Sequence, residues 1–310
     1  MGPILIFDKS TLQSLNEDEA MWLDNFFLSN ITPLFYIETL ADLEKEVKTG
    51  RTPEQVVGNL ASKTPDASSK CNVHHKALIA AELLGQEEIE MIHGRPIISG
   101  GRVLDLEGKT GVIFEPSPEE KAFERWQRGE FLQLERFQAK IWRDELSQIN
   151  FENIYKMFQR FFLIKRPKNF KDVKEFTDLC INNLDREAVL IFGLSLIGVS
   201  QESRIVILER YNVAGKPPLY EFAPYFTYVF SVDLFFYLGI AAGLIGRGRP
   251  SHKIDLAYLY YLPFCMIFTS NDKLHSSIVP FFLRKNHSYV LGTELKKDLA
   301  KLYAYYRKEY

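Results

Sequence analysis

The hydrophobic pattern of this chain changes twice along its length. Residues 4–7 form a short apolar run without helical period, and residues 31–37 and 264–268 repeat this pattern. Such runs are typical of buried strands in a parallel sheet. Residues 16–27 predict a helix with acids in its first turn, and residues 295–306 predict a closing helix. Both ends of the chain therefore predict an α/β unit.

The middle of the chain has mostly helical periodicity. Helical patterns cover residues 118–146, 151–163, 173–184, 188–197 and 203–211. Before them, residues 96–98 and 102–106 predict a β-hairpin joined by Ser99-Gly100-Gly101, and residues 112–114 predict a further strand. We predict an α/β core of residues 1–48 and 250–310. Residues 49–249 then form a mostly helical insertion with a small β-hairpin near 96–114.

Residues 222–245 are the most apolar stretch and are long enough to span a membrane. Asp233 lies near the centre of this stretch, where an acid is costly in lipid. We therefore predict a buried core helix and no membrane association.

Composition adds little that is specific. The chain has 310 residues, 46% of them hydrophobic, and a net charge of -2, which is ordinary for a globular protein. Cys71, Cys180 and Cys265 are far apart and odd in number, without a CxxC spacing. This pattern argues against a disulfide framework and a zinc site, and it predicts a reducing, cytoplasmic location. The start, Met1-Gly2-Pro3, lacks a basic region and its apolar run is too short for a signal peptide.

Acidic residues follow or accompany the predicted strands. Asp8 comes directly after the first strand, where ligands of open α/β sheets bind, although an acid there is often only a helix cap. Glu38 follows the second predicted strand, and Asp42 and Glu46 continue its row at helical spacing. That row also describes an ordinary solvated helix face.

Two more acids lie near the third strand. Asp255 falls in the first turns of a short helix that follows Ser251, and Asp272 comes after the strand in the sequence Thr269-Ser270-Asn271-Asp272. Four acids thus lie next to predicted strands in four separate segments, namely Asp8, Glu38, Asp255 and Asp272. Because the carboxyl ends of parallel strands meet at one edge, we expect these acids to converge there.

The order of these motifs resembles the PIN-domain family of metal-dependent nucleases. The resemblance rests on Asp8 with the hydroxyl residues Ser10 and Thr11, on Glu38 after the second strand, on Ile254-Asp255-Leu256-Ala257, and on the turn from Thr269 to Asp272. It covers residues 1–48 and 250–295 and does not extend to the long middle section. It implies a PIN-like (Rossmann-like) α/β/α sandwich with a central parallel sheet, here with a largely α-helical insertion.

The resemblance also implies an activity and roles for the residues. It implies an endoribonuclease that hydrolyses RNA phosphodiester bonds, as toxins, RNA-processing enzymes and defence nucleases do. Asp8, Glu38, Asp255 and Asp272 would be the catalytic and metal-binding residues, with Ser10, Thr269, Asn271 and Asp42 in support. Oxygen ligands without histidine or cysteine suit Mg²⁺ or Mn²⁺. Lys9, Lys273 and Arg249 are candidates to hold the substrate phosphate, or are exposed turn cations.

Partners and alternatives remain open at this stage. Residues 165–171 are densely basic and could bind RNA, or could be a solvated loop between helices. The helical insertion could bind RNA or a protein partner, or form a homo-oligomer. A non-catalytic PIN-like scaffold is one alternative. A phosphatase of the haloacid-dehalogenase type is another, but it requires an acid where this chain has Ser10.

Overall fold

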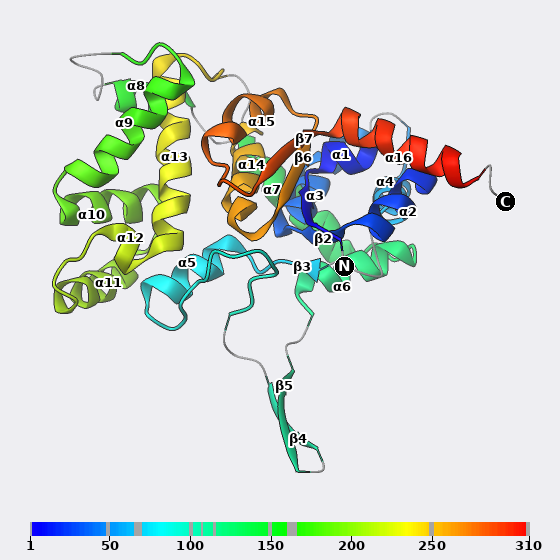
Figure 1. The fold of residues 1–310 in the computed structure, drawn as a ribbon, viewed down its shortest axis with the longest axis horizontal. Coiled ribbons are helices and arrows are strands. Elements are labelled where there is room, and N and C mark those ends of the chain that lie inside the picture. The colour runs from blue at the N-terminus through cyan, green and yellow to red at the C-terminus, as the bar shows by residue number, and fades with distance from the viewer. Residues whose placement is uncertain are drawn as a thin grey trace.

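We describe a computed structural model of the chain, which contains a five-stranded sheet, a separate hairpin and many helices (Figure 1). The structure describes residues 2–47, 50–64, 70–98, 102–106, 108–113, 116–147, 151–159, 166–247 and 251–307. The fold is mixed α/β, as the sequence predicts.

The sheet has the order β3-β2-β1-β6-β7, and all of its paired strands are parallel. Its strands are β1 (Ile4–Phe7), β2 (Leu28–Ile31), β3 (Lys70–Cys71), β6 (Ile267–Ser270) and β7 (Ser288–Leu291). Alternate residues of β1 enter two cores, with Ile6 on one face of the sheet and Leu5 and Phe7 on the other. The sheet is therefore covered on both faces, which parallel sheets require.

The helices fall into two groups. Those near the sheet are α1 (Lys9–Ser14), α2 (Glu17–Phe26), α3 (Pro33–Val47), α4 (Pro53–Ala61), α6 (Pro118–Gln127), α7 (Gln133–Ser147), α14 (His252–Ala257), α15 (Lys273–Ile278) and α16 (Gly292–Tyr306). The others are α8 (Phe151–Gln159), α9 (Phe170–Asn183), α10 (Arg186–Ile197), α11 (Gln201–Val213), α12 (Leu219–Phe222) and α13 (Pro224–Ala242). Between the two groups, α5 (His75–Leu83) packs against α13. Two 3₁₀ helices, η2 (Tyr258–Phe264) and η3 (Val279–Phe281), flank β6 and α15 in the chain. Figure 1 shows α8 to α13 gathered at one end of the molecule, with the sheet toward the other end.

Part of the range predicted as an insertion belongs with the sheet. β3 is a strand of the sheet, and α4 and α6 contribute Val56, Leu60 and Trp126 to the core that contains Phe7. The helical group of α8 to α13 instead packs in the core of the opposite face. The chain therefore contributes to the α/β unit from within residues 49–249 as well as from its two ends.

Two predicted strands begin at other residues in the structure. β2 ends at Ile31, and α3 begins at Pro33, so residues 33–37 are helical rather than extended. Pro33 lacks an N–H and has a φ angle suited to the first position of a helix. The predicted third strand over residues 264–268 is wrong in the same way: η2 occupies residues 258–264, and β6 begins at Ile267, beside Leu5 of β1.

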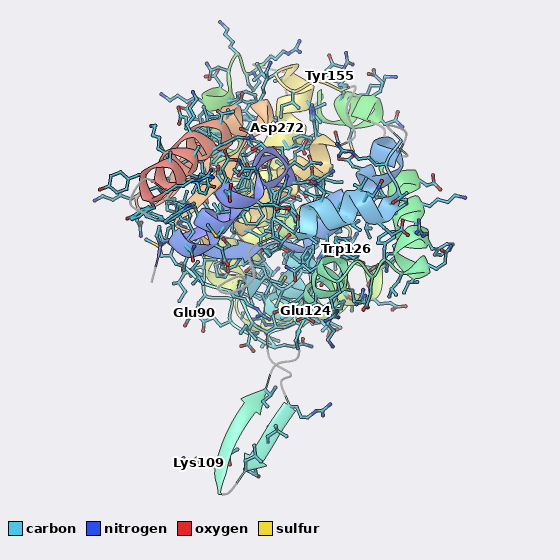
Figure 2. The ribbon with its side chains drawn as sticks, turned by 90° about the vertical axis from the view of Figure 1, so that its right-hand side faces the viewer. Glu90, Lys109, Glu124, Trp126, Tyr155 and Asp272 are labelled. Atoms are coloured by element: carbon cyan, nitrogen blue, oxygen red, sulfur yellow. The ribbon has the colours of Figure 1, made fainter. Side chains whose placement is uncertain are left out.

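The hairpin also differs from its prediction. β4 (Arg102–Leu106) pairs with β5 (Lys109–Ile113), so the connection lies at Gly108, whose φ is +78°, and not at residues 99–101, which are outside the described residues. A positive φ favours glycine in such a short connection. The hairpin that carries Lys109 projects from the body of the molecule, at the opposite end of the view in Figure 2 from Asp272.

The apolar stretch predicted as a core helix is α13, and 89% of its most apolar window is buried. Among the helices of the described residues, α13 alone is long and apolar enough to cross a membrane, a criterion of length and composition only. Asp233 in its middle accepts a hydrogen bond from the Lys253 ammonium at 2.6 Å and another from the Tyr260 hydroxyl. The carboxylate of Glu82 accepts hydrogen bonds from the N–H groups of Tyr225 and Phe226 at 2.9 and 2.7 Å, which satisfies the first turn of this helix.

Candidate active site

The strand order places a topological switch point between β1 and β6. From β1 the chain builds the sheet outward through β2 and β3, and it then returns to β6 on the other side of β1. Ligands of open α/β sheets bind outside the carboxyl ends of the strands at such a point. Asp8 follows β1 directly and Asp272 lies two residues beyond β6, so both acids flank the switch point.

Asp8 is held by three hydrogen bonds. Its Oδ1 accepts from the backbone N–H of Thr11 at 2.9 Å, and its Oδ2 accepts from the hydroxyls of Ser10 at 2.7 Å and Ser270 at 2.6 Å. The residue is 4% exposed and caps α1. Each carboxylate oxygen has two lone pairs, so Oδ1 keeps one for a further ligand.

Ser270 connects Asp8 to a histidine that the sequence did not single out. His275 Nδ1 lies 2.7 Å from Ser270 Oγ, and His275 Nε2 lies 2.6 Å from the backbone carbonyl oxygen of Asp255. A carbonyl oxygen only accepts, so Nε2 carries a proton. The Ser270 hydroxyl donates to Asp8 Oδ2 and accepts from the Asp272 N–H, so Ser270 links Asp8, Asp272 and His275 in one hydrogen-bonded network.

Glu38 and Asp255 lie at the rim of the same site, both half-buried. The Tyr258 hydroxyl donates to Glu38 Oε2 at 2.7 Å. Burial raises the pKa of Glu38 to about 7, with Asp8 and Asp42 adding to the rise while Lys9 and the Tyr258 hydrogen bond oppose it. Burial raises the pKa of Tyr258 as well, which keeps its hydroxyl proton in place for this bond.

Asp255 has the more strongly shifted carboxyl group. The pKa of Asp255 is raised to about 9, mainly by burial and then by the charges of Glu38, Asp272, Asp8 and Asp42. These interactions need proximity, so the structure brings all four predicted acids and Asp42 into one electrostatic cluster, which we call the acid cluster. An aqueous cation would be attracted to such a cluster.

The remaining predicted residues have several different environments. The buried Lys9 ammonium lies 2.9 Å from Asp42 Oδ2, so it neutralises an internal acid and is not exposed at the surface. Asp272 caps α15 through its side chain, and Lys273 beside it is exposed. Arg249 lies outside the described residues.

The supporting residues divide in a similar way. Ser10 binds Asp8, as expected of a residue that orients a carboxylate. The Thr269 hydroxyl is buried without a hydrogen-bond partner among the described residues, and the neighbouring Ser270 contacts Asp8 in its place. The Asn271 backbone N–H lies 3.4 Å from Ser10 Oγ, and the Asn271 side-chain Oδ1 is buried and also lacks a partner in the described part of the chain. Thr269 and Asn271 thus leave buried polar atoms beside the acid cluster that a bound group or water could satisfy.

The acid cluster offers oxygen donors but, within the described residues, no closely grouped set of metal ligands. Within the described residues, no three His, Cys, Asp or Glu side chains are grouped closely enough to hold one metal ion together. The donor set is nevertheless all oxygen, and burial, followed by the charges of neighbouring acids, raises the pKa of Glu38 and Asp255. Mg²⁺ commonly keeps several of its waters and binds one or two carboxylates, so these residues fit such an ion through water-mediated contacts.

Comparison of the chain with protein-family models, with curated proteins and with solved structures finds no match. The interpretation of the site therefore rests on its own geometry.

We expect that replacing His275 by Ala destabilises the protein by about 2–4 kcal/mol, because the ring is 1% exposed and bridges two segments. Urea unfolding in EDTA measures this change. His275→Gln keeps polar groups at this position and should recover part of the loss, whereas His287→Ala, on a half-exposed ring outside the cluster, should change the free energy of unfolding by less than about 1 kcal/mol. Equal effects of the two Ala variants would contradict a bridging role.

Proposed function

We propose that this chain is a PIN-like, metal-dependent endoribonuclease. The observation that carries the proposal is the convergence of acids from four separate segments at the switch point of a parallel sheet, with the pKa values of Glu38 and Asp255 raised to about 7 and about 9. Acids with perturbed pKa values in a crevice are typical of functional sites. The mixed α/β fold with its parallel sheet is compatible with the sandwich that the resemblance implies.

The residues have separate tasks in this proposal. Asp8 and Asp272 would hold the hydrated cation from the two strands of the switch point, and Glu38 and Asp255 would hold it from the rim. A bound Mg²⁺ or Mn²⁺ would lower the pKa of a coordinated water and offset charge on the phosphate. Ser10 and Ser270 fix the orientation of Asp8, and His275 fixes the position of Asp255 through its backbone carbonyl. Lys273, which is exposed beside Asp272, is the described cation that we assign to the phosphate.

RNA is the partner that we propose, and three buried, unpaired cysteines agree with the reducing cytoplasm as its location. The helical group of α8 to α13 would bind RNA or a protein partner. In the basic segment, however, Arg166 donates to the carbonyl of Ala242 at the end of α13, and Phe170 packs against Phe235. These two side chains stabilise the fold through intramolecular contacts, so we do not assign them to RNA binding.

A second candidate is a non-catalytic scaffold. It is favoured by the fact that Asp8 and Asp272 both cap short helices, a structural task that needs no metal. The two candidates differ in a single measurable property, which is whether the acids bind a cation and cleave a phosphodiester bond.

The proposal is tested by incubating the protein with labelled single-stranded RNA in Mg²⁺, Mn²⁺ or EDTA. We expect cleavage with either metal, none in EDTA, and at least about a 100-fold lower rate for Asp8→Asn. Asp298→Asn, which changes an exposed acid on α16, is the matched control and should retain the wild-type rate. If neither RNA nor DNA is cleaved with either metal, the nuclease proposal is rejected and the non-catalytic scaffold is the remaining candidate.

A further inference from the structure

A cavity of about 490 Å³ is lined in part by two helices that also carry acids of the cluster. Ile37 of α3 and Ile254 of α14 line it, and the next residue along each helix is an acid of the cluster, Glu38 or Asp255. A helix with its side chains is about 10–12 Å across, so the cavity and the acids are separated by no more than about that width. The two sites therefore share the same two helices.

The lining of the cavity is apolar with a balanced set of charges. Two cations, Lys76 and Lys253, and two acids, Glu119 and Asp233, are among its residues, and Asp233 and Lys253 already pair with each other. The volume lies within the range of small-molecule sites. An occupant group that matches this lining is uncharged, because an anion or cation would meet no net opposite charge.

One wall of the cavity is built from flat rings. His74 and His75 stack with centroids 4.4 Å apart, and the His75 ring lies 4.8 Å from that of Tyr260. Burial lowers the pKa of His74 to about 4 and that of His75 well below its ordinary value, so both imidazoles are neutral near pH 7. A neutral aromatic wall is suited to stacking with another planar ring.

His75 also has an unused polar atom. The residue is 9% exposed, and its Nδ1 is buried without a hydrogen-bond partner among the described residues. Its own backbone N–H donates to the Tyr261 hydroxyl at 2.8 Å, so the ring is fixed in place. A buried ring nitrogen without a partner requires an explanation, and an occupant with a polar edge would provide one.

We propose that this cavity receives one unpaired nucleobase of the RNA strand, next to the bond that is cut. A nucleobase is planar and uncharged, and its edge carries donors and acceptors that His75 Nδ1 can satisfy. The proposal rests on the proposed nuclease function, because the neighbouring acid cluster is what directs an RNA strand to this place. The cavity would then determine which base lies beside the cleavage point.

The test measures binding, in EDTA, of a short single-stranded RNA that contains the fluorescent base 2-aminopurine. Ile197→Trp fills the cavity from its rim at the end of α10 and should weaken binding at least about 10-fold, since stacking of a base on an aromatic wall contributes on this scale. Ile191→Trp makes the same change at an exposed position of the same helix outside the cavity, and it should bind as the wild type does. His75→Phe keeps the ring and removes its nitrogens, so it should retain affinity and change the preference among the four bases.

Each arm of this test has a defined meaning. Equal binding by the Ile197→Trp and Ile191→Trp proteins, or no fluorescence change on binding, would overturn the proposal. Free mononucleotides that bind in an Ile197-dependent manner, while the RNA does not, would overturn the assignment to a strand and indicate a free-nucleotide site. Because EDTA suppresses any metal-dependent cleavage, an Ile197-dependent affinity for RNA without cleavage in Mg²⁺ would retain the base site and reject the nuclease.

Discussion

Replacing Asp255 by Asn should lower metal-dependent RNA cleavage at least about 100-fold and, in EDTA, make the protein more stable. The loss of activity follows from the removal of one acid of the cluster. The gain in stability follows from the raised pKa of Asp255, about 9 in the folded protein against 3.8 for the ordinary carboxyl group. A residue that is unfavourable for folding and retained beside other acids is typical of a functional site.

The size of this gain in stability depends on pH. The folded protein keeps the Asp255 proton up to about pH 9, whereas the unfolded chain loses it near pH 4. The stability contributed by the bound proton is complete below pH 4 and is lost as the pH rises toward 9. Asn carries no titratable proton, so at pH 7 the variant should exceed the wild type by on the order of 2 kcal/mol, less than the full pKa shift implies because Asp255 is half-exposed.

Urea unfolding at pH 4, 7 and 9 in EDTA measures this difference, which should be absent at pH 4 and largest at pH 9. Glu38→Gln should show the same trend with a smaller effect, since the pKa of Glu38 is raised only to about 7. Asp298→Asn, at an exposed position, should show none. A loss of stability in Asp255→Asn at pH 7 would contradict the raised pKa of Asp255, which burial and the neighbouring acids cause.

Replacing Lys253 by Ala should destabilise the protein by about 3 kcal/mol. The Lys253 ammonium lies 2.6 Å from Asp233, whose side chain is 5% exposed in the middle of α13. Without this ammonium, Asp233 keeps the Tyr260 hydroxyl as a donor but has no opposite charge. An unpaired carboxylate in an apolar helix is strongly unfavourable.

A double variant separates the charge from the packing. Asp233→Leu combined with Lys253→Met removes both charges and keeps similar volume, but the buried Tyr260 hydroxyl then loses both of its partners. The double variant should therefore be more stable than Lys253→Ala and less stable than the wild type by about 1–2 kcal/mol. Urea unfolding of the single and double variants gives the comparison. If the double variant were as unstable as Lys253→Ala, the loss would come from packing and not from an unpaired charge.

From the sequence, the positions of the acids next to strands could be predicted more closely than the bounds of the strands and helices that carry them. Asp8 could be placed because a continuous apolar run ends directly before it. Glu38 was expected at the start of a helix and lies in its second turn, because Pro33 begins α3 directly after the short strand β2. β3 has only two residues, so it leaves no apolar run by which a strand could be recognised.

The groups that hold the acids in place could not be predicted. Tyr258 contacts Glu38 across 220 residues, and His275 contacts the Asp255 carbonyl across 20. Neither contact leaves a local pattern, since each depends on how separate elements pack. The same is true of the cavity of about 490 Å³, where His75, Asp233 and Tyr260 meet from three helices.

The central claim, that the acids form one site for a divalent cation, is tested most directly by calorimetric titration of Mn²⁺ at pH 7 in two buffers of different ionisation enthalpy. Binding should release protons, because Glu38 and Asp255 hold them in the metal-free protein and a cation favours their ionised forms. The observed heat of Mn²⁺ binding should therefore differ between the two buffers for the wild type. The Asp255→Asn protein should bind Mn²⁺ more weakly, and its heat of binding should differ less between the buffers. Absence of binding, or binding that is unchanged in both Asp8→Asn and Asp255→Asn, would contradict a metal site at this edge of the sheet.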